Sequence, residues 1–126
     1  MTEPRFLSVV EVEQLHEIAL EKFGGSPGIR NKAGFESAVM HPQNVYFYGD
    51  GDVFEIAAAY CFHLAEAQAF LDGNKRTAAA AAIVFLECNG YPLTGGAMRI
   101  HEALIDVAEK RIGKPQLAKL FKKLTA

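Results

Sequence analysis

Residues 53–82 read VFEIAAAYCFHLAEAQAFLDGNKRTAAAAA, and this stretch decides the fold. Residues 53–69 are apolar nearly all round, which is typical of a helix at the centre of a bundle. A second helix is predicted over residues 76–89, because it opens with the five alanines of residues 78–82 and alanine is the strongest helix former. The short polar segment between the two helices contains a glycine and predicts a tight loop.

The segments on either side predict further helices. Ser8 and Glu11 form a capping box that starts the first helix. Gly90 ends the alanine-rich helix, and Pro115 suits the first turn of a final one. Helices are therefore expected over residues 8–23, 33–40, 53–69, 76–89 and 97–111, and from residue 115 onward. The predicted fold class is all-α, a compact helical bundle.

Residues 42–51 are the exception to the helical pattern. Val45, Tyr46, Phe47 and Tyr48 are aromatic or β-branched, and a Gly-Asp-Gly turn follows them. Such a run predicts an extended flap or a small hairpin. An irregular loop whose aromatic side chains pack on the core is an equal alternative.

Composition and charge limit the class of protein. The chain has 126 residues, which predicts a single domain over residues 1–126. Half of the residues are apolar, 22% are charged, and the formal net charge is −2, which is ordinary for a globular protein. A general nucleic-acid-binding protein normally carries a basic excess, so no direct nucleic-acid partner is expected.

The two cysteines and the apolar stretches predict the compartment. Cys61 and Cys88 lie in apolar helical surroundings and are expected to be buried, reduced thiols. The chain does not open with the basic and then apolar run of a secretory signal. Its most apolar stretch, residues 53–71, contains charged and polar side chains and is not expected to span a membrane. The sequence therefore predicts a soluble, cytoplasmic protein.

Residues 68–77, QAFLDGNKRT, are the candidate site. A glycine-containing turn that leads into a helix presents backbone N–H groups and partial positive charge, which favour an anion such as phosphate. Lys75 and Arg76 add two positive charges there. Asp72 beside them suits Mg²⁺, which binds one or two carboxylates plus phosphate oxygens. The alternative is a solvated helix start, with Asp72 or Asn74 as the cap.

This segment resembles the signature of the Fic/Doc family, His-x-Phe-x-Asp/Glu-Gly/Ala-Asn-Gly/Lys-Arg. The lysine form is similar to the Doc (death-on-curing) branch, whereas Fic AMP-transferases usually have glycine there. The turn at residues 23–28 is also Doc-like, and the resemblance extends over residues 7–124. The matching residues are Phe70, Asp72, Gly73, Asn74, Lys75 and Arg76.

The resemblance implies an activity and a role for each matching residue. Doc proteins transfer the terminal phosphate of ATP to a protein hydroxyl, with elongation factor Tu as the known target, whereas Fic relatives transfer AMP. Asp72 would bind Mg²⁺ on the ATP phosphates, and Asn74 with the backbone at Gly73 would form the anion cradle. Lys75 and Arg76 would hold the phosphates and offset charge in the transition state.

Two further roles follow from the same resemblance. Phe70 would anchor the loop in the core. The predicted flap, with its side chains Val45, Tyr46, Phe47 and Tyr48, would lay a segment of the target protein beside the nucleotide by strand addition.

Position 68 departs from the family pattern, because Gln68 stands where the catalytic histidine is expected. That histidine is the general base of the family, and losing such a base typically costs about 10²–10⁴ in rate. A glutamine amide can orient a hydroxyl but cannot take its proton at neutral pH. Three explanations stay open: a deliberate replacement that spares the expression host, a naturally degenerate member that only binds, or a base elsewhere in the chain.

The other candidate bases have little to recommend them. His63 lies five residues before position 68, so the helix turns it away, and it is expected to pack within the bundle. Glu66 is expected to be solvated or to face the flap. No motif recommends His16, His41 or His101.

One absent motif bears on partners. Self-inhibited Fic proteins carry a Ser/Thr-x-x-x-Glu-Gly/Asn helix, and no glutamate here is followed by Gly or Asn. The resemblance therefore implies that an antitoxin in a separate chain inhibits the protein. A target in the translation machinery is implied in the same way, and no membrane partner is expected.

Overall fold

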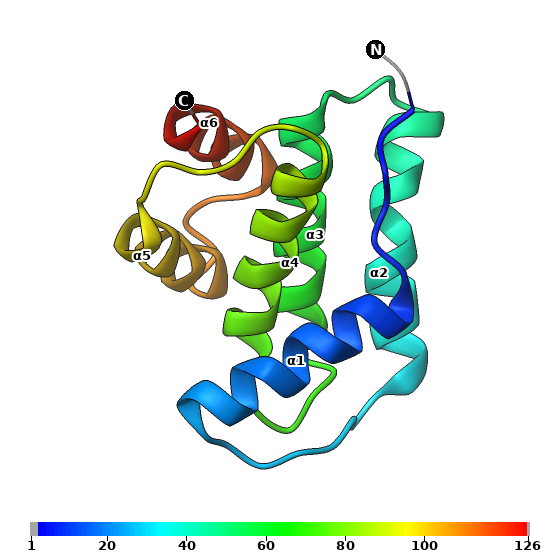
Figure 1. The fold of residues 1–126 in the computed structure, drawn as a ribbon, viewed down its shortest axis with the longest axis vertical. Coiled ribbons are helices and arrows are strands. Elements are labelled where there is room, and N and C mark those ends of the chain that lie inside the picture. Colours follow the sequence, from blue (N-terminus) through cyan, green and yellow to red (C-terminus); the bar gives the residue numbers. More distant parts are fainter. Residues whose placement is uncertain (1–2, 126) are drawn as a thin grey trace.

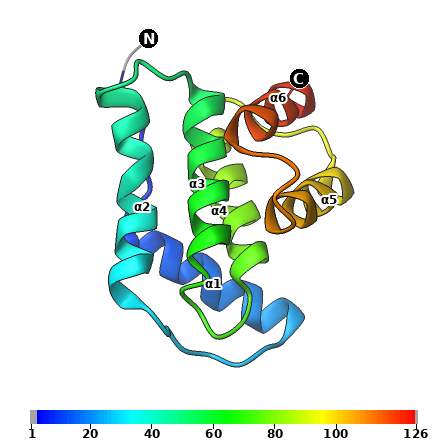
Figure 2. The ribbon, with the colours of Figure 1, turned by 180° about the vertical axis from the view of Figure 1, so that it is seen from behind.

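The two helices predicted from residues 53–82 form the centre of the molecule. The computed structural model describes residues 3–125. α3 and α4 lie side by side, α2 packs along α3, α5 and α6 lie on the opposite side, and α1 crosses one end of the pair (Figures 1 and 2). The predicted all-α bundle is confirmed. The elements are α1 (Val9–Phe23), α2 (Lys32–Phe47), α3 (Val53–Ala67), α4 (Asn74–Cys88), α5 (Ala97–Ala108) and α6 (Lys114–Leu124).

Small side chains let α3 and α4 approach closely. Ala57 and Ala58 of α3 and Ala78 and Ala81 of α4 are fully buried. Large side chains fill the space beside them, as where the rings of Tyr60 and Phe85 lie 5.2 Å apart. Burying a phenylalanine side chain contributes about 1.5–3 kcal/mol, so this contact between the two central helices is a main source of stability.

The helix starts differ in how they are capped. The predicted Ser8–Glu11 capping box is present at α1, and Asp52 and Glu55 form the same arrangement at α3. In each box, two backbone N–H groups that lack a partner within the helix are satisfied by side chains. The N-cap of α4 is Gly73, which offers no capping side chain. Its first N–H groups are therefore open to another partner.

The predicted flap is wrong. Val45, Tyr46 and Phe47 belong to α2, and Tyr48 caps its C-terminus, so the segment is neither a hairpin nor an irregular loop. α2 continues through a buried proline, and the rings of Tyr46 and Phe47 pack against Phe6 at 6.0 and 5.7 Å. Packing of these rings on the N-terminal segment overrides the local preference for strand, which is weak and depends on context.

The two cysteines differ in burial. Cys61 is a free thiol in the core, as predicted, and burial raises its pKa to about 12. Cys88 is also free but exposed, because it is the last residue of α4 and lies beyond the packed face of that helix. The prediction of burial is wrong for Cys88.

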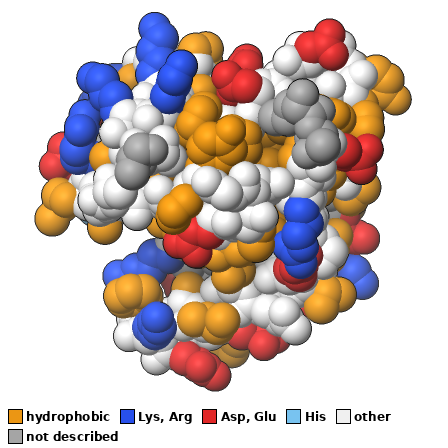
Figure 3. Space-filling view, turned by 45° about the horizontal axis from the view of Figure 1, so that its top comes forward, with side chains coloured by type: hydrophobic (Ala, Val, Ile, Leu, Met, Phe, Trp, Pro, Cys, Tyr) orange, Lys and Arg blue, Asp and Glu red, His pale blue; other side chains and the backbone are white. Residues whose placement is uncertain are grey.

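α6 separates apolar from charged side chains. Leu117, Phe121 and Leu124 are buried, while lysines occupy its exposed face. Figure 3 shows Lys and Arg side chains gathered over this helix. Across residues 3–125, no helix has the length and apolar character needed to cross a membrane.

Candidate functional site

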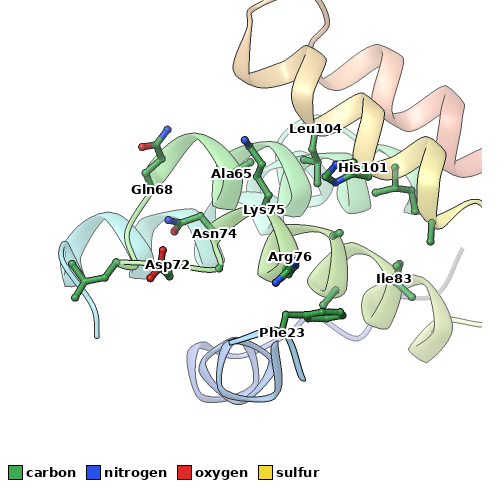
Figure 4. A pocket seen from close by; sticks show the side chains of 16 residues that line it. Phe23, Ala65, Gln68, Asp72, Asn74, Lys75, Arg76, Ile83, His101 and Leu104 are labelled. Carbon is green, nitrogen blue, oxygen red and sulfur yellow. The ribbon is translucent and has the colours of Figure 1, made fainter. Parts of the chain in front are cut away.

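A pocket of about 720 Å³ begins at the start of α4 and extends between α4 and α5. This volume is within the usual range of about 300–1,000 Å³ for small-molecule sites. Its polar end contains the predicted residues Gln68, Asp72, Gly73, Asn74, Lys75 and Arg76. Its apolar end is lined by Ala79, Ala80, Ile83, Ala97, Ile100 and Leu104, together with His101 (Figure 4).

The start of α4 leaves backbone donors uncapped at the polar end of the pocket. Gly73 adopts the left-handed conformation, with φ +80°, and turns the chain directly into the helix. The first helical hydrogen bond runs from the Thr77 N–H to the Gly73 carbonyl at 2.9 Å. The N–H groups of residues 74–76 precede that bond and have no partner within the helix. They supply donors and partial positive charge at the polar end of the pocket.

Asn74 holds the loop in shape. Its Oδ1 accepts a hydrogen bond from the Phe70 N–H at 3.0 Å, and its Nδ2 donates to the Phe70 carbonyl at 2.9 Å. Phe70 itself is buried, which agrees with the anchoring role implied by the resemblance. Because both ends of the Asn74 amide are engaged, its side chain positions the loop and its backbone N–H is the group open to a ligand.

Asp72 is partly committed to the neighbouring turn. Its Oδ2 accepts a hydrogen bond from the Ser26 N–H at 2.7 Å. Within residues 3–125, no group of three or more His, Cys, Asp or Glu side chains could hold a metal on its own. One carboxylate beside the uncapped, cationic helix start would nevertheless fit Mg²⁺ that arrives with a nucleotide, since such Mg²⁺ takes most ligands from phosphate and water.

The two cations remain available for a ligand. Neither Lys75 nor Arg76 forms an ion pair with a carboxylate in the described part of the chain. The Arg76 guanidinium lies over the Phe23 ring, 4.1 Å from its centroid. Figure 4 shows Arg76 against Phe23, with Lys75 projecting on the other side of the helix start. Such a cation–π contact holds the guanidinium in place without neutralising its charge.

Gln68 ends α3 in an uncommon conformation. Its φ and ψ are both 44°, in the left-handed region that residues other than glycine rarely adopt. The Arg30 side chain donates to the Gln68 carbonyl at 2.9 Å and holds the backbone there. The Gln68 side chain is exposed and lines the pocket (Figure 4). Its amide can form hydrogen bonds at this position but cannot accept a proton.

The extended segment beside the loop is not the one predicted. Ile29 forms an antiparallel bridge with Phe70, and the Leu71 N–H donates to the Gly28 carbonyl at 3.1 Å. The Arg30 N–H donates to the Ala69 carbonyl at 2.6 Å. The predicted flap at Val45–Tyr48 is absent from the pocket lining. Residues 28–31 are the extended segment that lies beside the loop.

The histidines occupy different surroundings. His63 is half-buried and accepts a hydrogen bond from the Lys114 ammonium at 3.1 Å, which fits the expected packed histidine. Burial, with smaller contributions from His41 and Lys114, lowers its pKa to about 4. His101 lines the pocket and His16 lies under the loop, and sequence reasoning missed both. No local sequence motif indicates that either histidine lies at the pocket or the loop.

The fold and this site define a class: an all-α domain that presents an uncapped, cationic helix start to a pocket for a small ligand. Comparison with known families gives the same class a name. The sequence model of the Fic/DOC family matches residues 6–86, and the chain belongs to this family.

Two relatives with assigned names are Doc proteins. The chain is 34% identical to "Protein kinase doc" of Escherichia phage P1 over 87 residues. This alignment covers 68% of this chain and 69% of the relative. It is 41% identical over 73 residues to "Toxin Doc" of Mycolicibacterium smegmatis (strain ATCC 700084 / mc(2)155), which covers 56% of each chain. The predicted resemblance to the Doc branch is confirmed.

Proposed function

We propose that this protein is a Doc-type toxin that transfers the terminal phosphate of Mg²⁺-ATP to a protein hydroxyl, with an activity weakened at Gln68. The main support is the pocket, which joins the uncapped start of α4 to an apolar end between α4 and α5. A ligand that fits both ends carries an anionic group at one end and a larger, less polar group at the other. A nucleotide has this combination.

The polar end supplies what phosphoryl transfer requires. The backbone N–H groups of residues 74–76, together with Lys75 and Arg76, would hold the phosphate chain and stabilise its charge in the transition state. Asp72 would bind Mg²⁺ on the phosphates, and the metal would neutralise part of their charge. The cofactor and co-substrate of the proposal are thus Mg²⁺ and ATP.

In the proposed reaction, the hydroxyl oxygen of the target forms a bond to the γ-phosphorus. The bond from that phosphorus to the bridging oxygen breaks, and ADP leaves. The hydroxyl proton must go to a base, and Gln68 cannot take it. Solvent water is then the acceptor, so the reaction is slower than with a histidine at this position by about 10²–10⁴.

A nucleotide-binding module without catalysis is the second candidate. The observation that favours it is Gln68 itself, because the exposed amide at the pocket can bind and orient a ligand but cannot act as a general base. The two candidates share the phosphate site and differ only in turnover.

We also propose partners on the basis of the family. The relative of Mycolicibacterium smegmatis is named a toxin, and on this basis the proposed partner is an antitoxin in a separate chain. The target would be a protein of the translation machinery, such as elongation factor Tu. AMP transfer, as in Fic relatives, is the alternative reaction at the same site.

Mass spectrometry of the target protein tests the proposal. The chain and its Gln68→His variant are each incubated with Mg²⁺-ATP and elongation factor Tu. We expect a phosphate adduct that forms much faster with the variant, whereas an AMP adduct would assign the alternative reaction. Growth arrest on expression of the Gln68→His variant is the matching assay in cells.

The outcomes separate the candidates. ATP binding without any adduct or growth arrest, even with Gln68→His, would leave the binding module as the function. Absence of ATP binding by calorimetry would refute both candidates.

A further inference from the structure

His16 of α1 is one of two buried polar or charged residues in the described chain, with 5% of its surface exposed. Its Nε2 lies 2.8 Å from the Asp72 backbone carbonyl. A carbonyl oxygen can only accept a hydrogen bond, so Nε2 carries the proton and donates. A buried histidine on one helix is thus bonded to the loop that joins two others.

The His16 ring supports the loop at two more places. It stacks on the Phe70 ring with centroids 3.6 Å apart and planes 8° apart. It also lies against Gly73, where an added Cβ would sit 3.4 Å from the His16 Cδ2 atom. The ring therefore lies against Phe70, which precedes Asp72 in the loop, and against Gly73, which follows it and caps α4.

We propose that His16 is a positioning residue, whose hydrogen bond to the Asp72 carbonyl and stacking on Phe70 set the backbone of the loop that receives the ligand. The identity of the ligand depends on the proposed function, whereas the positioning role of His16 does not. A rotation of the peptide at Asp72 would move both the Asp72 side chain and the N–H groups that follow it. Loss of the His16 donor therefore acts on the site without any contact between His16 and the ligand.

The same helix supports the site a second time. Phe23, seven residues after His16 and two turns further along α1, holds the Arg76 guanidinium. A buried imidazole N–H costs free energy unless it has a hydrogen-bond partner, whereas an apolar side chain would fill the same space without needing one. A histidine at this position is therefore explained by the Asp72 carbonyl, which accepts the hydrogen bond that its ring donates.

Two variants separate the two contacts. His16→Phe keeps an aromatic ring for Phe70 and removes the donor, while His16→Gln keeps a donor and removes the ring. Val12→Ala is the matched control, since Val12 is fully buried on the same helix one turn earlier. Amide hydrogen exchange is followed at Phe70, Leu71 and Thr77, whose N–H groups are hydrogen-bonded in or beside the loop. Amides in the middle of α3 serve as the internal reference.

With His16→Phe we expect the loop amides to exchange about tenfold faster relative to α3, because a buried hydrogen bond is lost. We expect Mg²⁺-ATP affinity by calorimetry to fall about three- to tenfold with His16→Phe, and His16→Gln should lie between His16→Phe and the unsubstituted chain. Val12→Ala should lower the melting temperature and leave both the relative loop exchange and the affinity unchanged.

The positioning role is overturned if His16→Phe exchanges like the unsubstituted chain, or if Val12→Ala loosens the loop to the same extent. If the loop amides respond to His16→Phe but the chain without this substitution does not bind ATP, the positioning role stands and the proposed function fails. If the Phe variant does not fold, the Gln variant decides: loop exchange equal to that of Val12→Ala refutes the role.

Discussion

The two central helices, α3 and α4, pack against each other along their length but begin in opposite ways. At α3, the Asp52 side chain accepts from the Glu55 N–H at 2.8 Å, and the Glu55 side chain accepts from the Asp52 N–H at 3.0 Å. At α4, Gly73 offers no side chain, and the first turn carries Lys75 and Arg76. An acidic cap stabilises a helix start, whereas cations there oppose the helix dipole.

The difference separates a helix start that its own side chains stabilise from one that lacks a capping side chain and carries two cations. The positive charges at the start of α4 would be unfavourable for an isolated helix, and an anion reverses the sign of that interaction. α3 meanwhile carries buried titratable side chains whose pKa values shift through burial, such as Tyr60, raised to about 12. We therefore expect changes at the start of α4 to alter ligand affinity, and changes in α3 to alter stability.

Arg76→Ala gives the largest expected effect. Charge-assisted hydrogen bonds are worth about 1.5–3 kcal/mol, so Mg²⁺-ATP affinity should fall about 10- to 100-fold in calorimetry, with little change in melting temperature. Arg99→Ala is the matched control, because Arg99 lies in the first turn of α5 behind the uncapped Gly96 and does not line the pocket. Equal losses of Mg²⁺-ATP affinity for Arg76→Ala and Arg99→Ala would contradict a specific binding role for the start of α4.

Asp52→Ala tests the opposite side of the comparison. The capping box at α3 would be lost, at a cost of about 1–2 kcal/mol in the free energy of unfolding. Urea unfolding measures this cost, and calorimetry should give unchanged Mg²⁺-ATP affinity. A loss of affinity without a loss of stability would contradict the structural role of this helix start.

His63 predicts a pH dependence of stability. Its folded pKa of about 4 lies below the usual 6.5, so the unfolded chain takes up the proton first as the pH falls. The contribution is complete above pH 6.5 and is lost as the pH falls toward 4. His63 is half-buried, so we expect a change on the order of 1 kcal/mol after solvent screening.

Urea unfolding between neutral pH and pH 4.5 measures this slope, and His63→Gln should flatten it. His101→Gln is the control, because His101 is exposed on α5 and not packed in the bundle. A slope that persists in His63→Gln would assign the pH dependence to another group.

Phe23→Ala gives the smallest effect. An exposed cation–π contact contributes about 0.5–1 kcal/mol, so Mg²⁺-ATP affinity should fall two- to fivefold as Arg76 loses its support. Phe23→Tyr keeps an aromatic face and should restore binding. If Phe23→Ala and Arg76→Ala are additive in calorimetry, Phe23 does not act through Arg76.

Local patterns were sufficient for much of this molecule. Apolar periodicity, alanine content and capping residues predicted the central helices and the Ser8 box, and the loop motif predicted which residues share the polar end of the pocket. These features depend on residues close together in the chain. The strand propensity of Val45–Tyr48 gave a wrong prediction, because it also depends only on neighbouring residues. The packing that makes this segment helical comes from Phe6, which is far away in sequence.

The amino-acid sequence alone determined the helical class, the family and the presence of Gln68 where the family pattern has histidine. Only the tertiary structure brought His16 under Asp72, Phe23 beneath Arg76, residues 28–31 beside the loop, and His101 into the apolar end. The physical reason is separation along the chain. The contacts of α1 with the loop and of α5 with α4 arise when apolar faces pack together, and no short-range spacing encodes which side chains meet there.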